Sequence, residues 1–352
     1  MSEINVSVIM PVFNASNFIH RSLQSVLSQT LRNIEIICVN DGSTDDSLEI
    51  LKQYSEKDKR VKVIDKNNEG YGKALNIGID IASGEYIGIL EPDDAANIHM
   101  FEDLYAIALD NDADVVKSNY YECEEKTHNL KMYESLKRLP YNKVITAEDN
   151  MNIFYVRPSV WSAIYRRNFL ISNSLRFDET PGASYQDTGF AFKVWCCAQR
   201  IVLTRNAYIY YTVDNTASSV KSSGKVYSVC DEMHSIESFL NQNSSFRNKY
   251  SKVLQSVKLD TYYWNLNRIS EDYKKQFIAT MGSEFLKSQY DGFLDKTVLG
   301  ETRWNILEPI LNEFIESPSK EEYEQVINSK AYKLGLGLLF IPKKMLEILR
   351  SR

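Results

Sequence analysis

The stretch Gly84-Glu-Tyr-Ile-Gly-Ile-Leu-Glu-Pro-Asp-Asp94 decides the fold, because an apolar run ends there abruptly in three carboxylates. The apolar residues 86–90 predict a short buried strand, which puts Glu91, Asp93 and Asp94 at its carboxyl end. Ligands bind at that edge of an open α/β sheet, and carboxylates gathered there can hold a hard divalent cation. Taken alone, the stretch also fits a solvated turn, since proline followed by two aspartates is ordinary turn chemistry.

Three more strands of this kind precede the quoted stretch. Short apolar runs occupy residues 6–13, 34–39 and 61–64, and apolar residues recur at helical spacing between them. Strands alternating with helices predict right-handed crossovers and a mostly parallel sheet. The loops that follow the four strands are therefore expected on one edge of that sheet.

The remainder of the chain changes character near residue 226. Before it, the patterns predict a helix over residues 100–109, a strand over 114–121 and a closing strand pair over 201–213. After it, long helical patterns continue without a convincing strand. Since 352 residues are too many for one small core, we expect an α/β domain over residues 1–222 and an all-helical domain over residues 223–352.

Composition excludes several classes of protein. The net charge of −6 argues against a nucleic-acid surface, which would need a basic stripe. The five cysteines are odd in number and lack C-x-x-C spacing, as expected of reduced thiols in a cytoplasmic protein. No signal peptide is recognisable, and no run of about 18 apolar residues predicts a spanning helix.

The four loops carry polar groups that suit a nucleoside diphosphate. These groups are Asn14, Asp41 with Ser43, the segment 70–73, and the segment 91–94. Asp41 can accept from the imide N–H of a uracil, Lys73 can meet phosphate charge, and the carboxylates can hold Mg²⁺ or Mn²⁺. Each residue also has an ordinary explanation, with Asp41 as a turn former and Lys73 as a surface lysine.

Two other nucleotide-binding motifs are absent from the sequence. A dinucleotide fingerprint needs G-x-G-x-x-G after the first strand, but Phe13 is followed by Asn-Ala-Ser. The segment Ser223-Gly-Lys225 lacks the upstream glycine of a P-loop.

In this order, the motifs resemble the family 2 glycosyltransferases with the GT-A fold, of the bacterial type that acts on cell-surface glycans or glycoproteins. The resemblance rests on residues 8–14, 39–45, 68–78 and 91–94, and it continues through residues 161–170 and 186–190. It implies a Rossmann-like mixed, mostly parallel sheet flanked by helices, to which the all-helical C-terminal extension is added. It also implies a transferase of the hexosyltransferase type.

The resemblance implies a donor site for a nucleotide sugar, expected to be a UDP-sugar. The residues that correspond to donor-binding positions are Pro11, Val12, Asn14, Asp41, Ser43, Gly70, Lys73, Glu91, Pro92 and Asp93. The D-x-D motif of the family corresponds to Glu91-Pro92-Asp93, which makes Asp93 the first expected ligand of Mn²⁺ or Mg²⁺ and Asp94 the second. Glu91 departs from the usual aspartate, so it can reach the ribose or bind metal only through water.

The catalytic base of the family corresponds to Asp187. Its neighbour Gln186 replaces the usual glutamate, which removes a like charge and by itself tends to lower the pKa of Asp187. The resemblance implies inverting transfer, in which Asp187 takes the proton of the acceptor hydroxyl. The alternative is a helix-capping or first-turn acid. Trp161, Tyr185 and Gln186 are the expected acceptor contacts, because aromatic rings suit the C–H faces of sugars.

Several alternatives stay open at this point. The chain could be a non-catalytic module that binds a sugar nucleotide or glycan, with Glu91 and Gln186 as signs of decayed catalysis. A glycan, a glycoprotein and a lipid-linked acceptor are all compatible with the sequence. The last segment, residues 334–352, is apolar and then basic, which fits peripheral contact with the inner face of the cell membrane, or packing on its own domain or on a second copy in a homo-oligomer.

Overall fold

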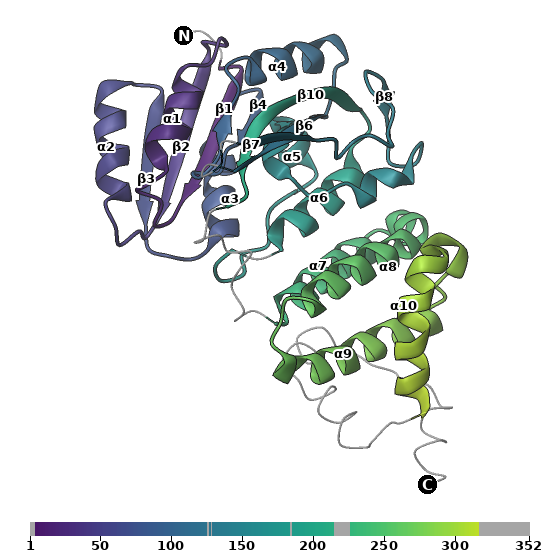
Figure 1. Ribbon diagram of the computed structural model, residues 1–352. Helices are drawn as coiled ribbons and strands as arrows, with labels where there is room; N and C mark the ends of the chain where they lie inside the picture. The colour runs from purple at the N-terminus through teal and green to yellow at the C-terminus, as the bar shows by residue number, and fades with distance from the viewer. Residues whose placement is uncertain (1–3, 125–126, 128, 184, 215–225, 317–352) are drawn as a thin grey trace. The chain divides into compact units, whose positions relative to one another are not determined.

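The structure is a computed structural model that describes residues 4–124, 127, 129–183, 185–214 and 226–316 (Figure 1). The chain forms two compact units. One comprises Met1–Ser222 with Phe239–Phe246, and the other comprises Ser223–Ser238 with Arg247–Arg352. The predicted tail segment at residues 334–352 lies outside the described residues.

The first unit is built on a mixed, mostly parallel sheet. Its first half contains four parallel neighbours, in the order β3 (Val61–Lys66), β2 (Ile34–Asp41), β1 (Val6–Val12) and β4 (Tyr86–Ile89). Both β1 and β2 are buried along their whole length, which explains their near-continuous apolar sequences. Because these strands are parallel, their carboxyl ends meet at one edge, as predicted.

The second half of the sheet adds antiparallel pairs. The order continues with β9 (Ala163–Arg166), β6 (Val115–Glu124), β10 (Ile201–Thr212) and β5 (Ala95–Ala96). Strand β9 runs antiparallel to both β4 and β6, whereas β6 and β10 are parallel. Two short strands, β7 (Asn129–Tyr133) and β8 (Val144–Ile145), pair with β6 and β10. Short strands 95–96, 144–145 and 163–166 give too little periodicity to be predicted.

Helices flank this sheet (Figure 1). They are α1 (Ile19–Leu27), α2 (Ser47–Lys57), α3 (Tyr71–Ile81), α4 (Met100–Asp110), α5 (Arg167–Ser172) and α6 (Gln186–Cys197), with 3₁₀ turns η1 (Met151–Tyr155) and η2 (Val160–Ser162). A Cβ on Gly78 of α3 would lie 2.4 Å from Ile9, and one on Gly88 of β4 would lie 2.5 Å from Phe101 of α4. Gly88 pairs with Val8 of β1 and lies on the same face of the sheet as Val8. Ile9 is the next residue of β1 and so points to the opposite face. Helices α3 and α4 therefore cover opposite faces at close approach.

The predicted strand pair over residues 201–213 is wrong, because the structure has one continuous strand, β10. The register with β6 shifts between Leu203 and Ala207 and again before Ile209. Arg205 and Asn206 are exposed at this irregularity, so two polar residues interrupt the apolar pattern without ending the strand.

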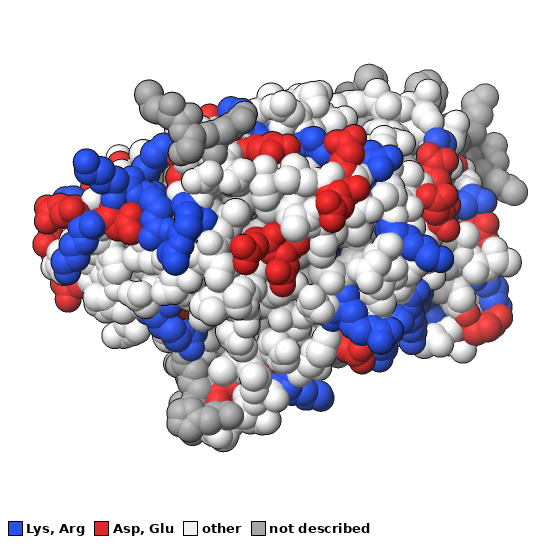
Figure 2. Space-filling model, turned by 90° about the horizontal axis from the view of Figure 1, so that it is seen from above, with Lys and Arg blue, Asp and Glu red and all other residues white. Residues whose placement is uncertain are grey.

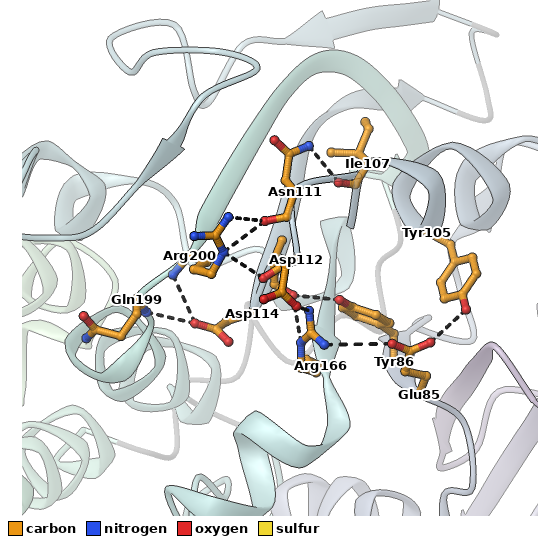
Figure 3. Close-up of polar contacts among 11 residues, drawn as sticks. Glu85, Tyr86, Tyr105, Ile107, Asn111, Asp112, Asp114, Arg166, Gln199 and Arg200 are labelled. Atoms are coloured by element: carbon orange, nitrogen blue, oxygen red, sulfur yellow. Dashed lines mark hydrogen bonds and ion pairs between the residues drawn. The ribbon is translucent and has the colours of Figure 1, made fainter. Parts of the chain in front are cut away.

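The amino-terminal edge of the sheet is closed by polar contacts (Figure 3). The Asp114 carboxylate accepts from the backbone N–H groups of Gln199 and Arg200, at 2.9 and 3.0 Å. The Arg200 side chain donates to the carbonyl oxygens of Asn111 and Asp112, and the Arg166 guanidinium donates to the Asp112 carboxylate. These contacts tie the start of β10 and the end of β9 to the turn before β6. This edge is thus structural, and the polar loops lie at the other one.

The described residues of the second unit are helical, as predicted. The helices are α7 (Ser228–Asn241) and α8 (Ser244–Leu266), which both cross a unit boundary, α9 (Glu271–Tyr290) and α10 (Lys296–Glu316). The Lys258 ammonium is buried between Glu237 and Glu284, at 2.8 and 2.6 Å. In the described part of the chain, no helix is long and apolar enough to cross a membrane. Acidic and basic side chains are interspersed over the face shown in Figure 2.

Candidate active site

The loops after β1 and β2 are locked together at the carboxyl edge. Asn14 has a left-handed backbone, with φ of 49°. Its side-chain oxygen accepts from the Thr44 N–H at 2.8 Å, and its own N–H donates to Ser43 Oγ at 3.0 Å. The predicted donor residues Asn14 and Ser43 therefore lie side by side and fix each other. Phe13, which the sequence did not single out, is half exposed beside them, at 50%.

Asp41 holds the loop after β3. Its side chain is buried. Oδ1 accepts hydrogen bonds from the Lys66 ammonium and the Glu69 N–H, and Oδ2 accepts one from the Gly70 N–H. Gly70 has φ of 100°, a conformation that favours glycine. The Oδ2 atom takes this one bond from the described residues, so it can accept one more.

Lys73 is engaged by a loop that precedes α6. Its ammonium lies 3.0 Å from Glu179 Oε2 and is about one-third exposed, at 35%. Gln186 holds the same loop, since its side-chain amide donates to Thr180 Oγ1 at 2.7 Å and to the Gly182 carbonyl at 3.0 Å. Gln186 is also almost fully buried. Its observed role is to anchor the loop, and an acceptor contact by Gln186 stays a prediction.

The acidic tip after β4 is held from two sides. From α1, the Arg21 guanidinium donates to the Asp93 carbonyl and to Thr212 Oγ1. From β10, the Thr212 N–H donates to Asp94 Oδ1 at 2.9 Å. The Ser22 hydroxyl donates to the Glu91 carbonyl at 3.1 Å. The tip is thus a fixed structure rather than a loose solvated turn.

The carboxyl groups of the tip are crowded. Burial, followed by the neighbouring Asp93, raises the pKa of Asp94 well above its usual range. Burial, with smaller contributions from Asp93 and Asp187, raises the pKa of Glu91 to about 8, although the Tyr71 hydroxyl donates a 2.5 Å hydrogen bond that opposes this rise. Contacts through Gly182 and Tyr71 also connect Gln186, the neighbour of Asp187, to Glu91 of the tip.

The tip fits a divalent cation shared with a diphosphate. Asp94 is fully buried, and its Oδ2 has no hydrogen-bond partner among the described residues. Such an orphaned carboxylate oxygen beside Asp93 suits a cation. No group of three or more acidic, histidine or cysteine side chains in the described residues is arranged to hold a metal. Mg²⁺ often takes one or two carboxylates and completes its shell with water and phosphate oxygens.

Asp187 lies in the first turn of α6. Burial raises the pKa of its carboxyl to about 6, opposed by the Thr188 N–H, which donates to Oδ1 at 2.8 Å, and by the Arg157 guanidinium. The pKa of Asp187 is therefore raised, although the neutral neighbour Gln186 was expected by itself to lower it. The helix has no side-chain cap, so Asp187 is not its cap, but it does occupy the first-turn position that the structural alternative gave it.

An aromatic cluster with one arginine lies beside the acidic tip, because its Tyr211 directly precedes Thr212, which bonds Asp94. Trp161 is nearly buried and stacks on Tyr211, with ring centroids 5.0 Å apart. Tyr120 packs edge-on against Trp161 and stacks on Tyr133, and Arg157 lies over the Tyr120, Tyr133 and Tyr211 rings. Sequence reasoning identified Trp161 but missed the others. The predicted acceptor residue Tyr185 is also mostly buried.

The fold and this edge define a class of α/β protein that can bind a nucleoside diphosphate. Comparison with known proteins identifies the family. Residues 7–171 match the family described as glycosyl transferase family 2. The glycosyltransferase GlyG of Streptococcus pneumoniae is 33% identical over 219 residues, which cover 60% of this chain and 71% of that protein. The chain belongs to glycosyltransferase family 2.

Two further comparisons are consistent with this. The uncharacterized glycosyltransferase YibD of Escherichia coli is 32% identical over 222 residues, but the match spans only 64% of its length and 62% of this chain. The crystal structure of S. aureus TarS 1-349 in complex with UDP-GlcNAc has a TM-score of 0.61 and 21% identity, covering 94% of this chain and 92% of that one. This structural match shows that the two chains share a fold, and thereby the predicted GT-A fold.

Proposed function

We propose that the chain is a metal-assisted, inverting glycosyltransferase that moves a sugar from a UDP-sugar to a hydroxyl of a glycan or glycoprotein. The observation that carries this proposal is the proximity of Asp187 to the acidic tip. Gln186, the neighbour of Asp187, donates to the Gly182 carbonyl, which also accepts from the Tyr71 N–H. The Tyr71 hydroxyl in turn donates to Glu91 of the tip at 2.5 Å, although α6 and β4 are far apart in sequence. A metal-binding tip and a base on the acceptor side are the two parts that sugar transfer requires.

The donor nucleotide is assigned to the edge formed by β1 and β2. Val12 and Asn40 are register partners, so Phe13 and Asp41 follow them on neighbouring strands. A base stacked on the exposed Phe13 ring would bring its polar edge to the free acceptor position of Asp41. The complex of TarS with UDP-GlcNAc supports a UDP-sugar as the donor.

The leaving diphosphate is assigned to the acidic tip. Asp93 and Asp94 would hold Mn²⁺ or Mg²⁺, which supplies positive charge for the leaving group. Arg21 fixes the backbone of these residues through the Asp93 carbonyl. Lys73, paired with Glu179, lies in the first turn of α3 and offers a second cation to the phosphates.

Asp187 is assigned as the general base. The carboxyl, with a pKa near 6, is ionised at neutral pH yet basic enough to take a proton from the acceptor hydroxyl as it attacks the sugar. Attack from the side opposite the diphosphate gives inversion in a single displacement. General-base catalysis of this kind contributes ~10²–10⁴ to the rate.

The two parts of the chain are given different roles. We assign residues 1–222 as the catalytic domain. Residues 223–352 are assigned as a helical domain that contacts the acceptor, a second copy of the chain, or the inner face of the cell membrane.

The proposal is tested by a thermal-shift screen of nucleotide sugars with and without Mn²⁺, followed by measurement of UDP release. Selective binding stabilises the folded state by mass action. We expect stabilisation by a UDP-sugar that requires Mn²⁺ and that Asp93→Ala removes. Stabilisation by no nucleotide sugar contradicts the proposal. Saturable binding without turnover indicates a non-catalytic binding module instead.

A further inference from the structure

Arg157 is an unusual residue for the site described above. Four carboxyl groups, those of Glu91, Asp93, Asp94 and Asp187, make this edge acidic. Arg157 comes from a segment that packs on α6, the helix of the carboxyl assigned as base. Its side chain is 40% exposed, so it is available to a ligand. The proposed mechanism does not use it.

The guanidinium is held in place by three tyrosine rings and by an ion pair with Glu122. Its Cζ lies 5.7, 5.9 and 5.1 Å from the ring centroids of Tyr120, Tyr133 and Tyr211, distances suited to cation–π attraction. Its one hydrogen bond to the described residues runs from NH1 to the Tyr120 hydroxyl, at 2.9 Å. Glu122 is 3.6 Å from the same nitrogen. The Nε and NH2 side of the fork is therefore open to a ligand.

A buried lysine, Lys117, fixes the turn at residues 157–162 that carries Arg157. The Lys117 side chain is 2% exposed. Its ammonium donates to the Ser159 carbonyl at 2.6 Å, to Ser159 Oγ at 3.0 Å and to Ser162 Oγ at 2.9 Å. These bonds hold residues 157–162, and with them both Arg157 and Trp161. A binding group fixed in this way loses little conformational entropy when a ligand arrives.

The position of Arg157 points to the acceptor rather than the donor. The base must lie beside the acceptor hydroxyl, because it removes the proton of that hydroxyl. The segment that carries Arg157 packs on α6, the helix of Asp187: the Phe154 ring contacts Phe192 with centroids 4.6 Å apart. The Val160 carbonyl accepts from Tyr165, whose ring packs edge-on against Phe190 of the same helix. The donor diphosphate, by contrast, belongs at Asp93 and Asp94. Tyr133 is 38% exposed next to Arg157 and offers a ring face to a sugar.

We propose that Arg157, with Tyr133 and Tyr211, forms an acceptor subsite that selects a sugar bearing an oxyanion close to the hydroxyl that Asp187 deprotonates. This inference rests on the proposed function of the site. An open guanidinium edge matches a carboxylate or a phosphate with two parallel hydrogen bonds. The acidic edge would otherwise repel such a sugar, so a cation fixed beside the base favours an acidic acceptor over a neutral one.

The test measures binding of three probes that share one ring: methyl glucoside, methyl glucuronide and methyl glucoside 6-phosphate. Binding to the full chain with UDP and Mn²⁺ is followed by ligand-observed NMR titration at pH 8, where Asp187 is ionised. We expect at least one acidic probe to bind about 10- to 100-fold more tightly than methyl glucoside, the range for a charge-assisted pair. The carboxylate and phosphate probes distinguish the two kinds of oxyanion.

Variants connect this preference to Arg157. Arg157→Gln should remove the preference for the acidic probe, and Arg157→Lys, which keeps the charge but not the fork, should retain part of it. The control Arg138→Gln changes an exposed arginine of the same unit and should keep the full preference. Equal binding of acidic and neutral probes by the wild type, or a preference that survives in Arg157→Gln, overturns the inference.

Failure of the proposed function gives a different result. UDP binding is measured separately in every preparation, and its absence from the wild type counts against the donor site, whatever the probes do. Normal UDP binding with no preference for acidic probes counts against the subsite alone.

Discussion

Asp187→Asn should make the protein more stable at neutral pH while removing most transfer. Burial raises the pKa of this carboxyl from 3.8 to about 6, so the fold disfavours the ionised group. At 1.36 kcal/mol for each pKa unit, this rise corresponds to about 3 kcal/mol at pH 7.5. The figure is an upper limit, because the side chain is partly exposed and asparagine changes the hydrogen bond to Thr188.

The sign of the effect depends on pH. Below pH 3.8 the carboxyl is protonated in both the folded and the unfolded chain, so it imposes no electrostatic cost. As pH rises from 3.8 through about 6, the unfolded chain loses the proton first, and the fold loses stability relative to it. The neutral amide avoids this loss. Asp187→Asn should therefore gain stability over the wild type at pH 7.5 and little at pH 4.

Thermal unfolding followed by circular dichroism at the two pH values measures this effect. For a domain of this size, 1 kcal/mol corresponds to about 2–4 °C in Tm. We expect Tm at pH 7.5 to rise by a few degrees, with a smaller difference at pH 4. An equal or lower Tm for Asp187→Asn at pH 7.5 would refute the conclusion that Asp187 is held ionised at a cost to the fold.

Three other predictions concern the base, the tip and the core. Because Asp187 must be ionised to act, kcat/KM should fall below pH 6 by about tenfold per pH unit, and a flat profile down to pH 5 contradicts the assignment. Arg21→Ala should weaken UDP binding in Mn²⁺ by about tenfold or more, because it removes the hydrogen bonds that fix the tip. Calorimetry measures the affinity, with Arg32→Ala, at an exposed arginine, as the control. Equal UDP affinities of the wild type and Arg21→Ala would count against this role of Arg21. Gly78→Ala should destabilise the fold by about 1–3 kcal/mol in urea unfolding, since its Cβ meets Ile9 Cγ2. In Ile9→Ala, which lacks that atom, the added Gly78→Ala change should cost less, and an equal cost in both backgrounds contradicts the contact.

The parallel half of the sheet could be predicted because its signals are local. Each apolar strand is followed by a polar turn, and parallel strands bring such turns to one edge. Asn14, Asp41 and the acidic tip were identified in this way. The sequence could not show that Asp41 bonds the Gly70 N–H or that Lys73 pairs with Glu179, because both contacts depend on how loops pack.

The acceptor side was much less predictable. Strand pairing among β6, β7 and β10 brings Tyr120, Tyr133 and Tyr211 together. Arg157 comes from a loop before η2 that Lys117 of β6 holds through Ser159. Trp161 was identified as an acceptor contact, yet it is nearly buried and stacked on Tyr211. Single aromatic residues in a sequence do not reveal which ring faces the ligand.

The central claim is that Asp187 is the base of a UDP-sugar-dependent transferase. Its most direct test compares UDP release by the wild type and Asp187→Asn with Mn²⁺ and a mixture of acceptors, with UDP affinity measured in the same preparations. We predict equal affinity and a rate lower by ~10²–10⁴ in the variant. Wild-type turnover by Asp187→Asn would contradict the assignment of the base, and UDP-sugar binding without turnover by the wild type would contradict the transferase activity itself.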